Sequence, residues 1–186
     1  MVKECLASGV ELIKEVNYEE SIWIKVKGER GRNTLFLGCV YMPTDSENVS
    51  IIESSYSKLK EDVLGMKERG QVVLLGDFNA RVGKSSELDD VIGMFGKGKC
   101  NASGNRLISF LHEVELVVCN SREFTVEPQW TRARPSLKQK SIIDYIVTDS
   151  NLLQVSGSVQ VDTTDIGISD HFLVWMELGR TVKATY

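Results

Sequence analysis

Residues 71–83, QVVLLGDFNARVG, decide how this chain is expected to fold. Positions 72–75 form a short apolar run rich in β-branched residues, which predicts a strand that is buried on both faces and ends at Gly76. Asp77 and Asn79 stand two positions apart, so in an extended backbone both side chains point to the same side. A carboxylate beside a carboxamide suits a metal ion or a phosphate. An Asx turn after the strand explains the same residues without any chemistry.

Three other apolar runs also begin or end at polar side chains. Upstream, residues 40–44 (VYMPT) close a predicted strand on Tyr41. Downstream, 141–145 (SIIDY) carries Asp144, and 167–171 (GISDH) places Asp170 and His171 just before the last predicted strand. Each residue alone has a structural explanation, as a strand cap, a wall residue or a hydrogen-bonding histidine. The four strand ends in this order are far more specific than any one of them.

A basic loop leads to Asp144. Trp130 is followed by Arg132 and Arg134 around Pro135, and two lysines come next. Arginine and lysine neutralise phosphates and an aromatic ring stacks on a base, so this loop suits a nucleic-acid backbone. A solvated loop beside a buried tryptophan explains the same composition.

Length and composition are those of one globular domain spanning residues 1–186. No run approaches the ~20 apolar residues of a membrane helix and no signal peptide is recognisable, so we expect no membrane contact and an intracellular location, nuclear or cytoplasmic. The net charge of −4 argues against a broad basic face but not against a nuclease, whose site gathers carboxylates around a metal. The cysteines form no C-x-x-C pair, and Cys39 and Cys119 are expected to be buried thiols.

Apolar periodicity predicts the other elements. Residues 21–27 and 34–41 predict a hairpin around a turn at 28–33. Apolar residues at steps of three and four predict helices over 50–67 and 104–113. A loop is predicted over 84–103, directly before the second helix. Apolar residues on both faces of the last strand, 172–176, predict a central position in a sheet.

Taken together, these segments resemble the endonuclease/exonuclease/phosphatase family, and within it the apurinic-type endonuclease domain of LINE-type retrotransposons. The resemblance runs from about residue 8 to about residue 178, and 129–132 resembles the family's T-W segment with Gln129 in place of threonine. It implies an α/β fold of two packed, mostly antiparallel sheets flanked by helices, the four-layer deoxyribonuclease-I-like sandwich. It also implies Mg²⁺ as the cofactor, or Mn²⁺ in its place, and DNA as the partner.

The resemblance implies a role for each strand-end residue. His171 contacts the scissile phosphate or takes the proton of the attacking water, and Asp144 holds the imidazole. Asp77 orients or deprotonates the water, Asn79 donates to a phosphate oxygen, and Tyr41 adds a phenolic donor. The two remaining assignments are Asp170 beside the metal, directly or through water, and substrate binding by Trp130, Arg132 and Arg134.

The sequence departs from the family pattern at its start. The family begins with a strand ending in asparagine and another ending in glutamate, a principal metal ligand, and neither motif precedes residues 8–13 here. We therefore expect a fold that lacks its first strands, with an open sheet edge for a missing N-terminal segment or a partner chain. Three functions stay open: a retroelement-derived DNA endonuclease, a related hydrolase of lipid or inositol phosphates, and an inactive remnant that binds nucleic acid or a partner.

Overall fold

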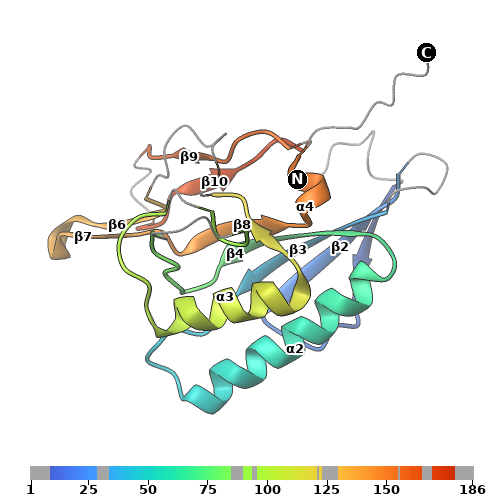
Figure 1. Cartoon of the computed structure of the whole chain (residues 1–186), viewed down its shortest axis with the longest axis horizontal. Coiled ribbons are helices and arrows are strands. Elements are labelled where there is room, and N and C mark those ends of the chain that lie inside the picture. The colour runs from blue at the N-terminus through green and yellow to red at the C-terminus, as the bar shows by residue number, and fades with distance from the viewer. Residues whose placement is uncertain are drawn as a thin grey trace.

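A six-stranded sheet organises the chain (Figure 1), in the order β1-β2-β3-β4-β8-β5. The computed structural model describes residues 9–28, 34–84, 90–93, 96–120, 122, 130–154, 156–164 and 169–178. Neighbouring strands run antiparallel except β3 and β4, which are parallel. The predicted hairpin is confirmed, since β2 pairs with β3, although residues 29–33 of its turn lie outside the described residues. The strands are β1 (Val10–Ile13), β2 (Ser21–Val26), β3 (Leu35–Tyr41), β4 (Gln71–Asp77), β5 (Val117–Val118) and β8 (Asp144–Thr148).

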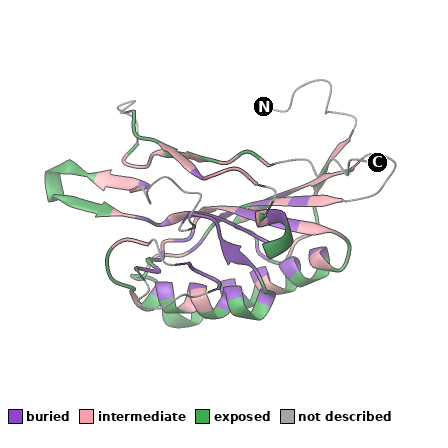
Figure 2. Cartoon of the chain, turned by 45° about the horizontal axis from the view of Figure 1, so that its top comes forward, coloured by how far each residue is buried: buried purple, intermediate pink, exposed green. Residues whose placement is uncertain are grey.

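Two helices cover one face of this sheet (Figures 1 and 2). α2 (Val49–Lys67) joins β3 to the parallel β4, and α3 (Ala102–Val114) leads into β5. Both predicted helices are confirmed. α3 begins two residues earlier than predicted because the side chain of Asn101 caps it, accepting the backbone N–H of Gly104 at 2.9 Å. The buried stripe consists of Ile52, Tyr56, Leu59, Val63 and Met66 on α2 and Leu107, Phe110, Leu111 and Val114 on α3.

A smaller sheet packs on part of the opposite face. β9 (Gln160–Asp162) pairs antiparallel with β10 (Leu173–Trp175), and the short α4 (Ser150–Leu153) lies between β8 and β9 in the chain. A second apolar cluster joins the sheets, with Val73 and Ile146 from the large sheet packed near Val174 of β10. The predicted α/β class, with sheets packed face to face beside helices, is thereby confirmed.

Two predictions about strand faces are wrong. The last strand is not central: within the described residues β10 pairs only with β9, and Leu173 is 65% and Trp175 44% exposed. Cys39 is exposed, whereas Cys119 is buried as predicted. Both errors have one cause, since a strand with apolar residues on two faces need not have both faces covered.

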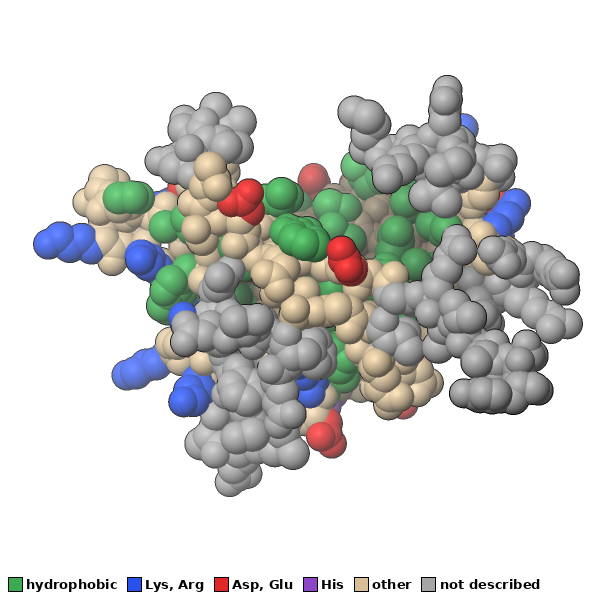
Figure 3. Space-filling view, turned by 90° about the horizontal axis from the view of Figure 1, so that it is seen from above, with side chains coloured by type: hydrophobic (Ala, Val, Ile, Leu, Met, Phe, Trp, Pro, Cys, Tyr) green, Lys and Arg blue, Asp and Glu red, His purple; other side chains and the backbone are tan. Residues whose placement is uncertain are grey.

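The uncovered surface lies on the β1–β3 half of the large sheet, opposite the helices. Its apolar side chains follow one face of three paired strands, as the Cα pairs Leu12↔Ile24 and Ile22↔Cys39 show. Figure 3 shows hydrophobic side chains at the surface on the side of the molecule that carries the small sheet. Leu12, Ile22 and Tyr41 are 56%, 66% and 53% exposed.

A narrow hairpin projects from one end of the molecule (Figure 1). It consists of β6 (Arg132–Arg134) and β7 (Gln139–Ser141), joined by a 3-10 turn (Pro135–Leu137). This hairpin contains the basic loop predicted after Trp130. Gln129 lies outside the described residues. The same holds for residues 85–89 and 94–95 of the loop predicted at 84–103. None of the helices in the described ranges is long and apolar enough to cross a membrane.

Candidate active site

Three of the predicted strand ends form one row across the large sheet. Tyr41 of β3 is the Cα partner of Asp77 in β4, and Asp77 is the partner of Asp144 in β8. Gly76 allows this close approach, because its φ of 144° and an added Cβ only 2.0 Å from the carbonyl oxygen of Val40 exclude other residues. The register of the sheet therefore brings the side chains of three distant segments to one edge.

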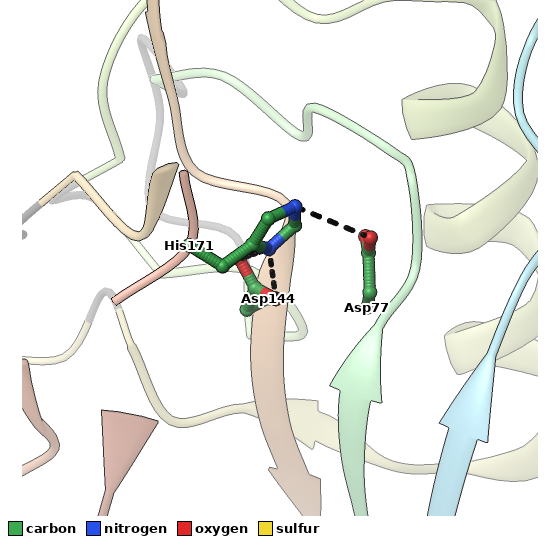
Figure 4. A group of neighbouring side chains, drawn as sticks. All are labelled: Asp77, Asp144 and His171. Atoms are coloured by element: carbon green, nitrogen blue, oxygen red, sulfur yellow. Dashed lines mark hydrogen bonds and ion pairs between the residues drawn. The ribbon is translucent and has the colours of Figure 1, made fainter. Parts of the chain in front are cut away.

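His171 completes the group from outside the large sheet (Figure 4). Its Nδ1 lies 3.0 Å and 3.2 Å from the two carboxylate oxygens of Asp144, and its Nε2 lies 3.8 Å from Oδ2 of Asp77. A carboxylate only accepts, so Nδ1–H donates to Asp144 and the lone pair of a neutral imidazole is left on Nε2. The imidazole is thereby held in the tautomer that can accept a proton on the side facing Asp77.

The two carboxyl groups share a mostly buried position, with 15% of the Asp77 side chain and 16% of the Asp144 side chain exposed. Burial raises the pKa of Asp77 to about 6, and the charge of Asp144 adds to the rise, although the N–H of Asn79 opposes it. Burial also raises the pKa of Asp144, against hydrogen bonds with Thr131 and His171. Asp77 therefore titrates close to the pH range in which a carboxyl group exchanges protons with water in catalysis.

Asn79 forms the Asx turn and also lies in the site. Its backbone N–H donates to Oδ1 of Asp77 at 2.8 Å, and its φ is 47°. Its amide Nδ2 donates to the carbonyl oxygen of Met42 at 2.8 Å, which uses one of its two amide protons. The hydroxyl of Tyr41, by contrast, makes no hydrogen bond to any described residue. Asn79 thus ties the end of β3 to the end of β4, and Tyr41 presents a free phenol beside them.

Asp170 contacts two arginines. Its Oδ2 accepts from Nε of Arg132 at 2.8 Å and from Nε of Arg134 at 2.7 Å. The hydrogen bond from Arg134 lowers the pKa of Asp170. Its Oδ1 lies 3.9 Å from Nε2 of His171, so the arginine pair stands next to the histidine. Trp130 is partly buried against the main core, and Nζ of Lys97 lies 5.5 Å from the centre of its ring.

Among the residues that the structure describes, Asp77, Asp144 and His171 fit a metal ion, since their potential ligand atoms all lie within 4.8 Å of one another. Two neighbouring carboxyl groups with raised pKa values suit a divalent cation, because the ion stabilises their ionised form. Because hard divalent cations prefer oxygen ligands, the carboxylate oxygens of Asp77 and Asp144 are better ligands than the imidazole. Asp170 does not belong to this group among the described residues.

Two buried polar residues hold Asp144 in place and have no role in the sequence prediction. The hydroxyl of Thr131 accepts the backbone N–H groups of Ile143 and Asp144 at 3.1 Å and 3.2 Å. Asn120 donates its amide to the carbonyl oxygen of Asp144 at 3.0 Å and accepts the N–H of Ile146 at 2.9 Å. Asn120 carries the same signal as Asp77, a polar residue at the end of an apolar run, whereas nothing in the sequence distinguishes Thr131.

Comparison with known proteins gives one family and two curated relatives. The model of a family described as endonuclease-reverse transcriptase matches residues 35–175, more than half of the chain. Craniofacial development protein 2 of Bos taurus is 32% identical over 111 residues, and that of Tragulus javanicus is 31% identical over the same length. Each alignment covers 58% of this chain but only 18% and 19% of the relatives, so the chain spans less than a fifth of their length.

Solved nuclease structures share the fold at low sequence identity. The endonuclease domain of TRAS1, a telomere-specific non-LTR retrotransposon, superposes with a TM-score of 0.66 and 20% identity over 91% of this chain and 68% of that one. The 3′-5′ exonuclease NExo of Neisseria meningitidis gives 0.64 and 19% over 92% and 71%. The AP endonuclease LMAP of Leishmania major gives 0.62 and 13% over 87% and 55%.

Proposed function

Because this chain belongs to the endonuclease-reverse transcriptase family, we propose that it is a metal-dependent phosphodiester hydrolase that nicks DNA and derives from a retroelement. Family and fold are those of nuclease-type and phosphodiesterase-type hydrolases. The single observation that carries the proposal is the convergence of Asp77, Asp144 and His171 at one edge of the sheet. The family description supports the retroelement origin.

His171 and Asp77 act on the attacking water in this proposal. Nε2 of His171 accepts the proton of the attacking water or contacts the scissile phosphate, while Asp144 fixes the ring through Nδ1. Asp77 orients the water through its carboxylate. Tyr41 and Asn79 supply a phenolic O–H and an amide N–H to phosphoryl oxygens. Holding water, base and phosphate in one geometry removes much of the entropic cost of the reaction.

Asp77 and Asp144 are the residues that would hold the cation, for which we propose Mg²⁺ or Mn²⁺. When bound, such an ion offsets charge on the phosphoryl and leaving oxygens. Without it, burial raises the pKa of both carboxyl groups, and the charge of Asp144 adds to the rise at Asp77. The chain's own contribution is to fix both carboxylates through the strand register and through Thr131 and Asn120.

DNA is the proposed partner because positively charged arginine side chains lie beside the catalytic residues. Arg132 and Arg134 lie on the first strand of the projecting hairpin, next to His171 through Asp170. Arginine donates to phosphate oxygens with several N–H groups at once. Trp130 has one ring face near Lys97, so its proposed contact with the substrate uses the remainder of the ring. A partner segment at the open sheet edge stays a prediction, and the exposed apolar side chains of β1–β3, such as Leu12 and Ile22, are the surface that it would cover.

Nicking of supercoiled plasmid with Mg²⁺ tests the function. His171→Ala should lower the nicking rate by about 10²- to 10⁴-fold, the usual contribution of a positioned general base. His112→Ala is the matched control, since His112 is exposed on α3 and contacts none of the site residues. Equal background cleavage by all three proteins removes the enzyme assignment. Cleavage of an inositol phosphate in place of plasmid reassigns the substrate, and DNA binding without cleavage indicates an inactive binding protein.

A further inference from the structure

The Asp170 carboxylate joins two cations at one oxygen. Both Arg132 and Arg134 reach Oδ2 with their Nε–H groups. A guanidinium carries five N–H donors, so four on each arginine remain for other acceptors. The side chains are 21%, 46% and 37% exposed for Arg132, Arg134 and Asp170, which leaves the pair accessible from solvent. Two arginines and one carboxylate also leave an excess of one positive charge.

The backbone fixes this cluster relative to His171. The N–H of Ala133 donates to the carbonyl oxygen of Asp170 at 2.9 Å, and the N–H of Phe172 donates to that of Thr131 at 2.8 Å. Arg132 and His171 face each other in the resulting antiparallel bridge. Residues 170–172 therefore form a third strand-like segment beside the hairpin, and the arginines cannot shift far without moving the histidine.

We propose that Asp170 is a positioning residue that holds Arg132 and Arg134 as a fixed guanidinium pair, that this pair binds a phosphate of the DNA backbone next to the one cleaved, and that Asp170 is not a metal ligand. This inference rests on the proposed function and replaces the metal role expected from the sequence. The negative charge of Asp170 is already offset by two guanidinium groups, so its carboxylate attracts a cation less strongly than the carboxylates of Asp77 and Asp144. Arginines already held in place lose less conformational entropy when they bind a phosphate.

The metal part of the proposal is tested with the ion alone. Thermal unfolding is followed during titration with Mn²⁺ or Mg²⁺, for the wild type, Asp170→Asn and Asp77→Asn. Asp170→Asn should leave the midpoint of the metal-induced shift within about twofold, while Asp77→Asn should raise it at least about tenfold, as expected for loss of a carboxylate ligand. Equal effects of the two substitutions would overturn the proposal. Asparagine is isosteric with aspartate, and the unfolding curve without metal reports directly whether each variant folds.

The positioning part is tested by DNA binding in EDTA, where no cleavage intervenes. Asp170→Asn and Arg134→Gln should each weaken binding of a short duplex by about 5- to 10-fold, and the double variant should be no weaker than the weaker single one. Arg134→Gln should also reduce the slope of log K against log salt by about 0.9, the value for one phosphate contact. Tighter binding by Asp170→Asn, or additive losses in the double variant, would overturn the proposal.

A second exposed ion pair supplies the control. Lys60 on α2 and Glu113 on α3 lie 2.6 Å apart on the helical side of the molecule, and Glu113→Gln should leave DNA binding unchanged. The two hypotheses also fail separately. If nicking depends on His171 but Asp170 and Arg134 are not coupled in DNA binding, the proposed hydrolase function stands and the positioning role of Asp170 is wrong. If the two residues are coupled in DNA binding but no nicking occurs, the positioning role stands and the hydrolase function is wrong.

Discussion

At the scale of single residues, the site is organised by carboxyl groups that differ in their surroundings. Asp77 and Asp144 are mostly buried and have raised pKa values, whereas the arginine-paired Asp170 has a lowered pKa. The sequence identified all three as candidates from their places at strand ends. It did not pair Asp170 with the arginines, because they lie 36 and 38 residues away and the contact depends on how the hairpin pairs with residues 170–172.

The raised pKa of Asp77 makes stability depend on pH in a defined direction. Burial favours the protonated form in the folded state, with a pKa of about 6 against 3.8 for a free aspartate side chain. The unfolded chain therefore binds fewer protons between these values, and stability falls as pH rises through the interval. The cost is fully present above about pH 6 and absent below the unfolded pKa.

Asp77→Asn should remove this cost in metal-free buffer. At pH 7.5 the variant should be more stable than the wild type by up to about 2–3 kcal/mol, and at pH 4 the two should be nearly equal. Urea unfolding with EDTA at both pH values measures the difference. The variant should at the same time lose nicking activity, as expected for a site that is strained for function. A variant less stable than the wild type at pH 7.5 would contradict the electrostatic account.

At the scale of elements, the sequence predicts the helices and strands whose apolar side chains pack into a core. α2 and α3 were found because their apolar residues follow the helical period and face one core, and β4 because its continuous apolar run is buried on both faces. The position of β10 was not found, because a run of apolar residues does not tell which of its faces is covered. The site depends on the correctly predicted part, since the register between β3, β4 and β8 aligns Tyr41, Asp77 and Asp144.

Gly76 tests how tightly that register is specified. Gly76→Ala should destabilise the protein by at least about 2 kcal/mol, because the added Cβ meets the Val40 carbonyl and φ is unfavourable for alanine. Gly65→Ala in α2 is the control, since nothing lies within 4 Å of its added Cβ. There alanine should stabilise the helix by about 0.5–1 kcal/mol. Urea denaturation distinguishes the two, and similar values for both would show that β3 and β4 can separate locally.

At the scale of the whole molecule, the two faces of the large sheet are covered unequally. The helices bury one face, while the small β9–β10 sheet leaves apolar side chains of β1–β3 exposed on the other (Figure 2). Adjacent residues of β2 illustrate the contrast, since Trp23 is fully buried and Ile22 is 66% exposed. Alternation along residues 21–27 indicates a half-buried strand but does not tell which of the two sides is covered. The tryptophan is buried because Gly38 lies opposite it, and an added Cβ there would lie 2.8 Å from the indole.

The unequal covering predicts opposite responses to substitution at these two neighbours. Ile22→Thr should change the free energy of unfolding by less than about 1 kcal/mol and reduce concentration-dependent light scattering, because it removes exposed apolar surface. Trp23→Leu should cost about 3 kcal/mol or more, because it opens a cavity between the sheet and its helices. Urea unfolding and light scattering of both variants measure these effects. If Ile22→Thr were as destabilising as Trp23→Leu, the β1–β3 face would already be covered within the chain itself, and a partner segment would have no apolar surface left to bind.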